Sequence, residues 1–370
     1  MAASRRASML IAAALMCSAD AFRAPARPLR GVAGIAGRRG GLAGRSDVAR
    51  RGGLAGRSDV VARRAVLIVD HVNLNHEKGR HDLLKAFYFD LLGLTADPRK
   101  AENIGKGKKT LWANAGIAQL HLPEGAPNAQ PLDGRLTLAY ASLDRFDAAR
   151  LEAAEAALAG TKFQIRRSPD GFDVVCPWGT PVSLKEDPEA ADPRGAQPGD
   201  AGDALHIVDI ALHVDRKADL AGVKRFYTKV MGVPAADATL IAGELLVLKI
   251  GPAQTLTFLK KPMGKAAHAD LGEDDDGLPT NGGIHISMYV DDLGACYDAA
   301  DALGLAFVNY RFKRRAHTKE EALDQCMFRV VDVVDPDAPE AGPIVQVEHE
   351  IRSTKKVDGS KYKSCPLREV

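Results

Sequence analysis

The chain is poor in cysteine, and its cysteines form no pattern. Five of them stand at positions 17, 176, 296, 326 and 365 of the 370 residues, and no Cys-x-x-Cys pair occurs. This excludes a disulfide framework as the basis of the fold, so reduced thiols are expected. The apolar run near the N-terminus, Ala7–Cys17, is too short to cross a bilayer.

A basic excess is missing from most of the chain. The formal net charge is +2, but residues 1–65 hold thirteen arginines against three aspartates. The other residues therefore contain 37 basic and 45 acidic side chains, a net charge of −8. Binding to a phosphate backbone needs clustered Lys and Arg, so this balance argues against a nucleic-acid partner.

Residues 1–64 have the features of a targeting presequence without a packed fold. Arg5-Arg6 precedes the apolar run, and the small residues Ser18–Ala21 follow it, as in a secretory signal peptide. The Phe22-Arg-Ala-Pro25 stretch and the segment rich in Arg, Gly and Ala behind it resemble the two-part presequence of algae with complex plastids. This implies a plastid location, with plain secretion as the alternative. No membrane association is expected after the presequence is removed.

Residues 66–352 repeat one order of elements four times: a strand, a helix and two or three further strands. The opening strands are expected at 66–74, 136–143, 206–214 and 284–290. Repetition in a fixed order indicates modules. A small β-α-β-β-β module has a sheet edge that a second module must cover. We therefore predict an α+β fold in which four modules pair into two domains.

Composition sets the expected boundaries. Consecutive modules are expected to pair, which gives a first domain at 66–188 and a second at 204–352. The segment 189–203 between them is rich in Asp, Pro, Gly and Ala, as linkers are. Residues 353–370 are expected to form a loose polar tail.

Several short phrases make a family resemblance specific. The strand opening Asp-His-Val-Asn-Leu at 70–74 precedes a helix that holds Phe87-Tyr88, and the third module repeats the aromatic pair as Phe226-Tyr227. With closing phrases such as Gln119–Glu124, about 286 of the 370 residues resemble the vicinal oxygen chelate superfamily. That superfamily includes glyoxalase I, extradiol dioxygenases and drug-sequestering proteins. The resemblance implies glyoxalase-like domains, a small molecule in the cleft, and a divalent metal such as Zn, Ni, Mn or Fe.

The resemblance also implies where metal ligands should stand. In the superfamily they come from the first and last strands of paired modules, where residues of one parity point into the cleft. Equivalent positions on the first strands hold His71, Asp209 and His285, and the second module offers only Arg135 or Thr137. The last strands offer four candidates: Gln119, Ser183, Thr257 and Gln346. His121 and Glu348, two residues beyond the glutamines and with the same facing, are possible substitutes.

With consecutive modules paired, neither ligand set is complete. The first domain would have His71 and Gln119, and the second Asp209, His285 and Gln346, which are expected to converge. An extradiol site needs two His and one Glu, so dioxygenase chemistry is disfavoured. The first hypothesis is a divergent glyoxalase-type lyase or isomerase, with Asp209 or Glu348 as the base. The alternative is a non-catalytic binding protein that kept the cleft and lost the metal.

Overall fold

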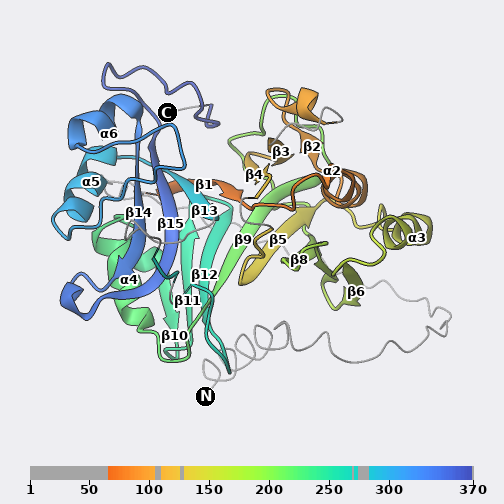
Figure 1. Ribbon diagram of the computed structural model, residues 1–370, viewed down its shortest axis with the longest axis horizontal. Helices are drawn as coiled ribbons and strands as arrows, with labels where there is room; N and C mark the ends of the chain where they lie inside the picture. The colour runs from red at the N-terminus through yellow and green to blue at the C-terminus, as the bar shows by residue number, and fades with distance from the viewer. Residues whose placement is uncertain (1–65, 105–109, 126–128, 269–270, 274–282, 369–370) are drawn as a thin grey trace, which may run out of the picture.

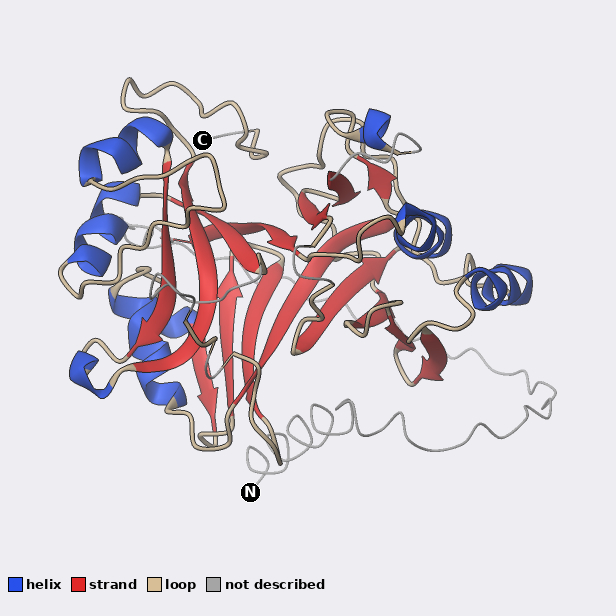
Figure 2. Cartoon of the chain, in the orientation of Figure 1, coloured by secondary structure: helices blue, strands red, loops and turns tan. Residues whose placement is uncertain are grey.

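The computed structural model describes residues 66–104, 110–125, 129–268, 271–273 and 283–368. The expected presequence, residues 1–64, lies outside these ranges. The described chain is a mixture of sheets and short helices, which confirms the predicted α+β class (Figure 2).

Two mixed sheets form the body of the described chain. The first has the strand order β14 (Met327–Val334), β15 (Pro343–Ser353), β13 (His285–Val290), β1 (Val66–Asn73), β4 (Ala118–Pro123), β3 (Thr110–Ala115), β2 (Thr95–Ala96). The second has the order β10 (Ala238–Ile241), β11 (Leu245–Ile250), β12 (Gln254–Lys260), β9 (Ala204–Val214), β5 (Gly134–Tyr140), β8 (Pro181–Glu186), β7 (Gly171–Val175), β6 (Gln164–Ser168). In every module the first strand pairs in parallel with the last strand.

The modules pair differently from the expectation. The first strands of the first and fourth modules, β1 and β13, are antiparallel neighbours, and so are β5 and β9 of the second and third modules. The expected pairing of the first module with the second, and of the third with the fourth, was therefore wrong. The ranges 66–188 and 204–352 describe successive modules along the chain, and each sheet draws on both ranges.

The helices lie outside the sheets. Their bounds are α2 (His81–Leu84) with a π-helical continuation (Lys85–Leu91), α3 (Ala148–Ala157), α4 (Leu220–Lys229), α5 (Leu293–Asp301) and α6 (Lys319–Gln325). In Figure 1, α4, α5 and α6 gather on one side of the strands, and α2 and α3 lie on the opposite side. Asp147, Asp219, Asp292 and Thr318 cap α3 to α6, because each side chain accepts a bond from a backbone N–H of the first turn. No helix in the described ranges has both the length and the apolar character of a membrane span.

Two parts of the fourth module differ from the expectation. From the sequence we predict a strand at 307–312, but it does not form: Phe307 makes only an isolated bridge to Arg329, and the chain continues as a loop. Helix α6 follows that loop and was not expected. The loop covers the centre of the first sheet, where Phe312 and Asn309 contact side chains of β13, β14 and β15.

The C-terminal segment packs against the first sheet, so the expectation of a loose polar tail was wrong. Tyr362, Cys365 and Leu367 are buried together with Ile68 of β1 and Tyr289 of β13. These apolar side chains stand among lysines and serines, so the average composition of the segment is polar and does not reveal them.

One side chain of the second sheet anchors β1. Gln254 of β12 accepts a hydrogen bond from the N–H of Val69 (2.8 Å) and donates to the carbonyls of Val69 (3.1 Å) and Ile207 (3.0 Å). The register of β1 against β13 shifts between Val69 and His71, as at a β-bulge. Gln254 thus satisfies backbone groups at the irregularity that sets the direction of His71.

Candidate metal centre

Three metal-type donors converge on the first sheet. They are His71 of β1, His285 of β13 and Glu350 of β15, which are neighbouring strands. The Nε2 atoms of the two histidines are 3.2 Å apart, and His285 Nε2 lies 3.8 Å from a Glu350 oxygen. One donor atom from each residue lies within 4.8 Å of the other two, and all three residues are buried. Two imidazoles and a carboxylate in this arrangement form a potential facial metal site.

Each histidine is oriented by its other nitrogen. His71 Nδ1 lies 2.8 Å from the Asp70 carboxylate, and His285 Nδ1 donates to the carbonyl of Gly283 at 3.0 Å. Carboxylates and backbone carbonyls are the usual partners that fix a metal-binding imidazole. Both rings therefore direct Nε2 toward the shared space.

The protonation of the two rings fits a cation between them. Burial, with the charge of Arg352, holds the pKa of His71 well below its usual range. Burial, with the charge of Arg329, also lowers the pKa of His285, so both rings are neutral. If Nδ1 of each ring carries the proton, two bare Nε2 atoms face each other at 3.2 Å and repel unless a metal ion lies between them. Burial raises the pKa of Asp70 to about 7, so a protonated Asp70 can instead donate to His71 Nδ1, and the proton on His71 Nε2 then bridges the two rings.

Ser287 is a second observation that fits a group bound beside the two histidines. Its Cα position is level with His71 on one side and with Glu350 on the other. The hydroxyl is fully buried, and its oxygen has no hydrogen-bond partner. A buried hydroxyl without a partner is costly, and a bound metal–water group would satisfy it.

Two arginines hold the glutamate ionised. Burial alone would raise the pKa of Glu350, but the charges of Arg352 and Arg329 outweigh burial and hold that pKa well below its usual range. Arg329 also pairs with Glu348, and Arg352 lies 3.4 Å from Asp70. The carboxylate is thus kept in the form that a metal requires, although both of its oxygens already accept bonds from arginine.

Aromatic and polar side chains close the centre. Phe312, from the loop before α6, lies edge-on to His285 at 5.2 Å and over the guanidinium of Arg329 at 4.0 Å. Asn309 of the same loop donates to Glu348 at 2.7 Å. On the other side His121 stacks on His71 with ring centres 3.6 Å apart. The cover excludes water, which strengthens electrostatic interactions within the site.

The structure brings only part of the predicted set together. Gln119 is level with His71, but its amide nitrogen donates to Asp97 (2.7 Å) and Asn114 (2.6 Å). Glu348 is level with His285, so it is the true equivalent of Gln119. Gln346 was therefore assigned two residues too early. Its side chain bonds to Asp332 and to the N–H of Leu271.

Asp209 does not join His285 and Gln346, so the predicted convergence was wrong. It lies on β9 in the second sheet, where Thr255 and Thr257 donate to one of its oxygens at 2.5 and 2.8 Å. Burial raises the pKa of Asp209 against the effect of these two bonds. In the part of the chain that the structure describes, no group of three His, Cys, Asp or Glu side chains surrounds it. Asp209 is a hydrogen-bonded strand residue.

The candidate ligand that sequence reasoning missed is Glu350. With the fourth module paired to the first, two histidines and this glutamate complete the set that an extradiol-type centre needs, so the earlier objection to that chemistry no longer holds. A signal was present in Val-Glu-His-Glu at 347–350, where two acids share one face of a strand.

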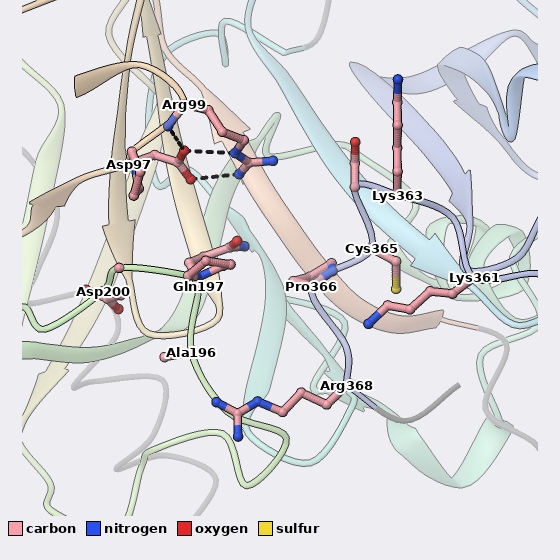
Figure 3. Close-up of a pocket in the computed structure, with 14 residues that line it drawn as sticks. Asp97, Arg99, Ala196, Gln197, Asp200, Lys361, Lys363, Cys365, Pro366 and Arg368 are labelled. Carbon is pink, nitrogen blue, oxygen red and sulfur yellow. Dashed lines mark hydrogen bonds and ion pairs between the residues drawn. The ribbon is translucent and has the colours of Figure 1, made fainter. Parts of the chain in front are cut away.

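A cavity of about 660 Å³ lies near the centre. Asp97 and Arg99 form one wall, the segment around Gln197 a second, and the C-terminal segment a third (Figure 3). The C-terminal segment contributes Lys361, Lys363 and Arg368. A series of contacts links the cavity wall to the candidate metal centre. Asp97 of the wall bonds to Gln119, Gln119 contacts His121, and His121 stacks on His71.

Comparisons with known proteins show similarity to solved structures alone. No protein-family model matches this sequence, and no curated protein matches it either. Similar solved structures include a candidate dioxygenase from Bacillus subtilis, with 13% identity over 79% of this chain and 86% of that one and a TM-score of 0.45. The cppA protein of Streptococcus pneumoniae shares 10% identity over 78% of this chain and 98% of its own, with a TM-score of 0.37. The 2,3-dioxygenase LapB of Pseudomonas sp. KL28 shares 14% sequence identity, and the match covers 79% of this chain and 93% of LapB with a TM-score of 0.28. Values this low carry no argument about activity, which must come from the site.

Proposed function

We propose that this protein is a divalent-metal-dependent enzyme of the vicinal oxygen chelate type, with its metal held by His71, His285 and Glu350. The observation that carries the proposal is the pair of Nε2 atoms 3.2 Å apart, each ring fixed from behind and each facing the third donor. Neutral imidazoles and an ionised carboxylate are the protonation states that metal binding requires.

The residues around the donors have separable tasks. Asp70 and the Gly283 carbonyl orient the rings, and Arg329 with Arg352 keeps Glu350 charged. A bound divalent metal would supply a Lewis acid with open positions for two neighbouring oxygens of a substrate. The aromatic cover of Phe312 keeps bulk water from that space.

The donor set decides the order of candidate reactions. Two histidines and one carboxylate with open positions are typical of non-haem iron(II) oxygenases. We therefore place oxidative ring opening of a vicinal diol first, with both atoms of O₂ entering the product. A glyoxalase-type isomerase comes second, because the fourth ligand that such sites use would be Gln119, which is turned to Asp97. The cationic side chains of the adjoining cavity favour an anionic substrate.

A non-catalytic binding protein is the competing proposal, and one observation favours it. Arg329 and Arg352 both donate to Glu350, so a metal must share this carboxylate with two arginines. If the arginines replace the metal's charge, the centre would bind an anionic molecule without turning it over.

The test is metal loading followed by turnover. Purified full chain is stripped with a chelator, loaded anaerobically with Fe(II), and assayed for O₂ uptake with catechol and carboxylated catechols. We expect about one Fe(II) at this centre, and loss of at least 100-fold in activity for His285→Ala and His71→Ala. His317→Gln, at an exposed histidine, is the control. Metal retention with turnover of a hemithioacetal alone would establish the isomerase, and a wild-type chain that retains no metal here would establish the binding protein.

A further inference from the structure

A second group of metal-type donors lies outside the centre described above. It consists of His76, His81 and Glu124, and one donor atom from each lies within 4.8 Å of the other two. His76 follows β1, Glu124 follows β4, and His81 is the first residue of α2. Backbone bonds from His76 N to the Pro123 carbonyl (2.9 Å) and from Gly125 N to the His76 carbonyl (2.8 Å) extend the pairing of the two strands to this point. Two of the three donors are therefore held on a rigid frame.

The two imidazoles are left without partners. His76 is only 1% exposed, and neither of its ring nitrogens makes a hydrogen bond. The carbonyls of Leu122 and Pro123 lie near the ring but outside bonding geometry. Both nitrogens of His81 are also buried and without a hydrogen bond, and its Nε2 is 3.9 Å from Glu124. Buried polar atoms of a folded protein are normally bonded, so four such nitrogens in one place point to a missing ligand.

We propose that His76, His81 and Glu124 form a second divalent-metal site, with zinc as the best-suited ion. Zinc takes imidazole nitrogen and carboxylate oxygen in tetrahedral geometry, and three protein ligands leave one position for water. The present separations shrink to zinc-ligand geometry when each donor atom moves inward by about 1 Å at most. The site shares no residue with the His71, His285 and Glu350 centre, so it stands or falls independently of the proposed function.

The position suggests what the metal does. A ligand from α2 and two from the strand ends would join the 74–81 loop to the first sheet, beside a cavity of about 500 Å³.

Trp178 lines that cavity, and its ring centre is 5.8 Å from that of His76. A paramagnetic ion at the site would therefore quench the fluorescence of Trp178.

The chain permits a clean experiment, because it contains only two tryptophans. The full chain carrying Trp112→Phe and His285→Ala leaves Trp178 as the sole tryptophan and disables the first centre. After removal of metals, this background protein is titrated with Co(II), followed by fluorescence, and with Zn(II), followed by calorimetry. We expect about one equivalent of either ion, quenching by Co(II), and a higher melting temperature with Zn(II).

Adding His81→Gln to the background should weaken Zn(II) binding at least tenfold and abolish the quenching, and Glu124→Gln should act in the same direction. His317→Gln in the same background should change neither. His81 is replaced rather than His76 because its side chain is the more exposed of the two, at 14%. If the His285→Ala background fails to fold, the stoichiometry of Zn(II) on the otherwise unmodified chain, with and without His81→Gln, replaces it. Binding that is absent, or unchanged by His81→Gln, would overturn the proposal.

Discussion

His71 and His285 are 214 positions apart in the chain, yet their Nε2 atoms lie 3.2 Å from each other. The antiparallel pairing of β1 with β13 brings the two strands together, and the bulge at Val69 and His71 turns the first ring toward the second. Hydrogen bonds behind both rings leave little rotational freedom. Such preorganisation lowers the cost of binding a metal, because the ligands are already in place.

The charge of Glu350 should matter to both stability and metal binding. Glu350→Gln removes a carboxylate that two arginines contact, and it leaves buried Arg329 with less compensation. We expect a loss of about 3 kcal/mol in the free energy of unfolding of the metal-free protein, as for other broken buried ion pairs. Metal retention should also fall. Urea denaturation and elemental analysis measure the two effects, and Glu340→Gln at an exposed position is the control. Unchanged stability and metal content would argue against this charge arrangement.

Gln254 should be essential to the geometry of β1. Gln254→Leu keeps the volume but leaves the N–H and carbonyl of Val69 and the carbonyl of Ile207 without this partner. Each buried backbone group left unpaired costs about 1–3 kcal/mol, so we expect a total loss of at least about 3 kcal/mol for the three groups. Denaturant midpoints test this, with Gln164→Leu on the exposed position of β6 as control. Equal effects of the two substitutions would contradict the anchoring role.

The C-terminal segment should contribute measurably to stability. Leu367→Ala truncates a side chain that is 2% exposed, and we expect a cost of about 2–3 kcal/mol. The nearby Cys365 should then react faster with a thiol reagent, because the segment detaches more often. Val357→Ala, at a side chain that is 76% exposed, provides the comparison within the same segment. A loosely attached segment would instead show equally small effects for both and a Cys365 that reacts rapidly in the wild type.

His206 should make stability depend on pH. Burial lowers the pKa of this histidine to about 4 in the folded chain, against an ordinary value of 6.5. Between pH 6.5 and 4 the unfolded chain therefore holds a proton at this position that the folded chain does not. Stability should fall as the pH falls through that window, by up to about 3 kcal/mol from this residue. His206→Gln should remove this part of the dependence, so the difference in denaturation midpoint between wild type and variant should shrink from pH 7 to pH 5. A constant difference would contradict the buried neutral state.

Local pattern was enough to find most elements of the fold. The apolar alternation at 66–74 and 284–290 corresponds to β1 and β13, and the helix expected to hold Phe226-Tyr227 is α4. The pairing of modules could not be found in the same way. Every module offers the same kind of edge strand, so local sequence does not say which two edges meet.

That gap also explains the errors at the site. His71 and His285 were named as ligands, but with the wrong partners, because consecutive modules were assumed to pair. Matching the two glutamine phrases put Gln346 in the place that Glu348 occupies, a shift of two residues. With that shift the candidates on the strand were Gln346 and Glu348, and Glu350 was left out. Residues two positions apart in a strand point to the same face, so an alternation pattern cannot reveal a register error of two residues.

The pairing of the outer modules has a consequence for synthesis of the chain. The second and third modules can join as soon as both have left the ribosome, whereas β1 must wait with an open edge until β13 has been made. An exposed edge that persists through most of translation invites wrong pairing, so this strand is where nascent-chain protection is needed. If His71, His285 and Glu350 hold a metal as proposed, one donor comes from the first module and two from the fourth, so the metal could bind there only after β15 has been made. A product truncated before β15 would lack Glu350 and could not complete that centre.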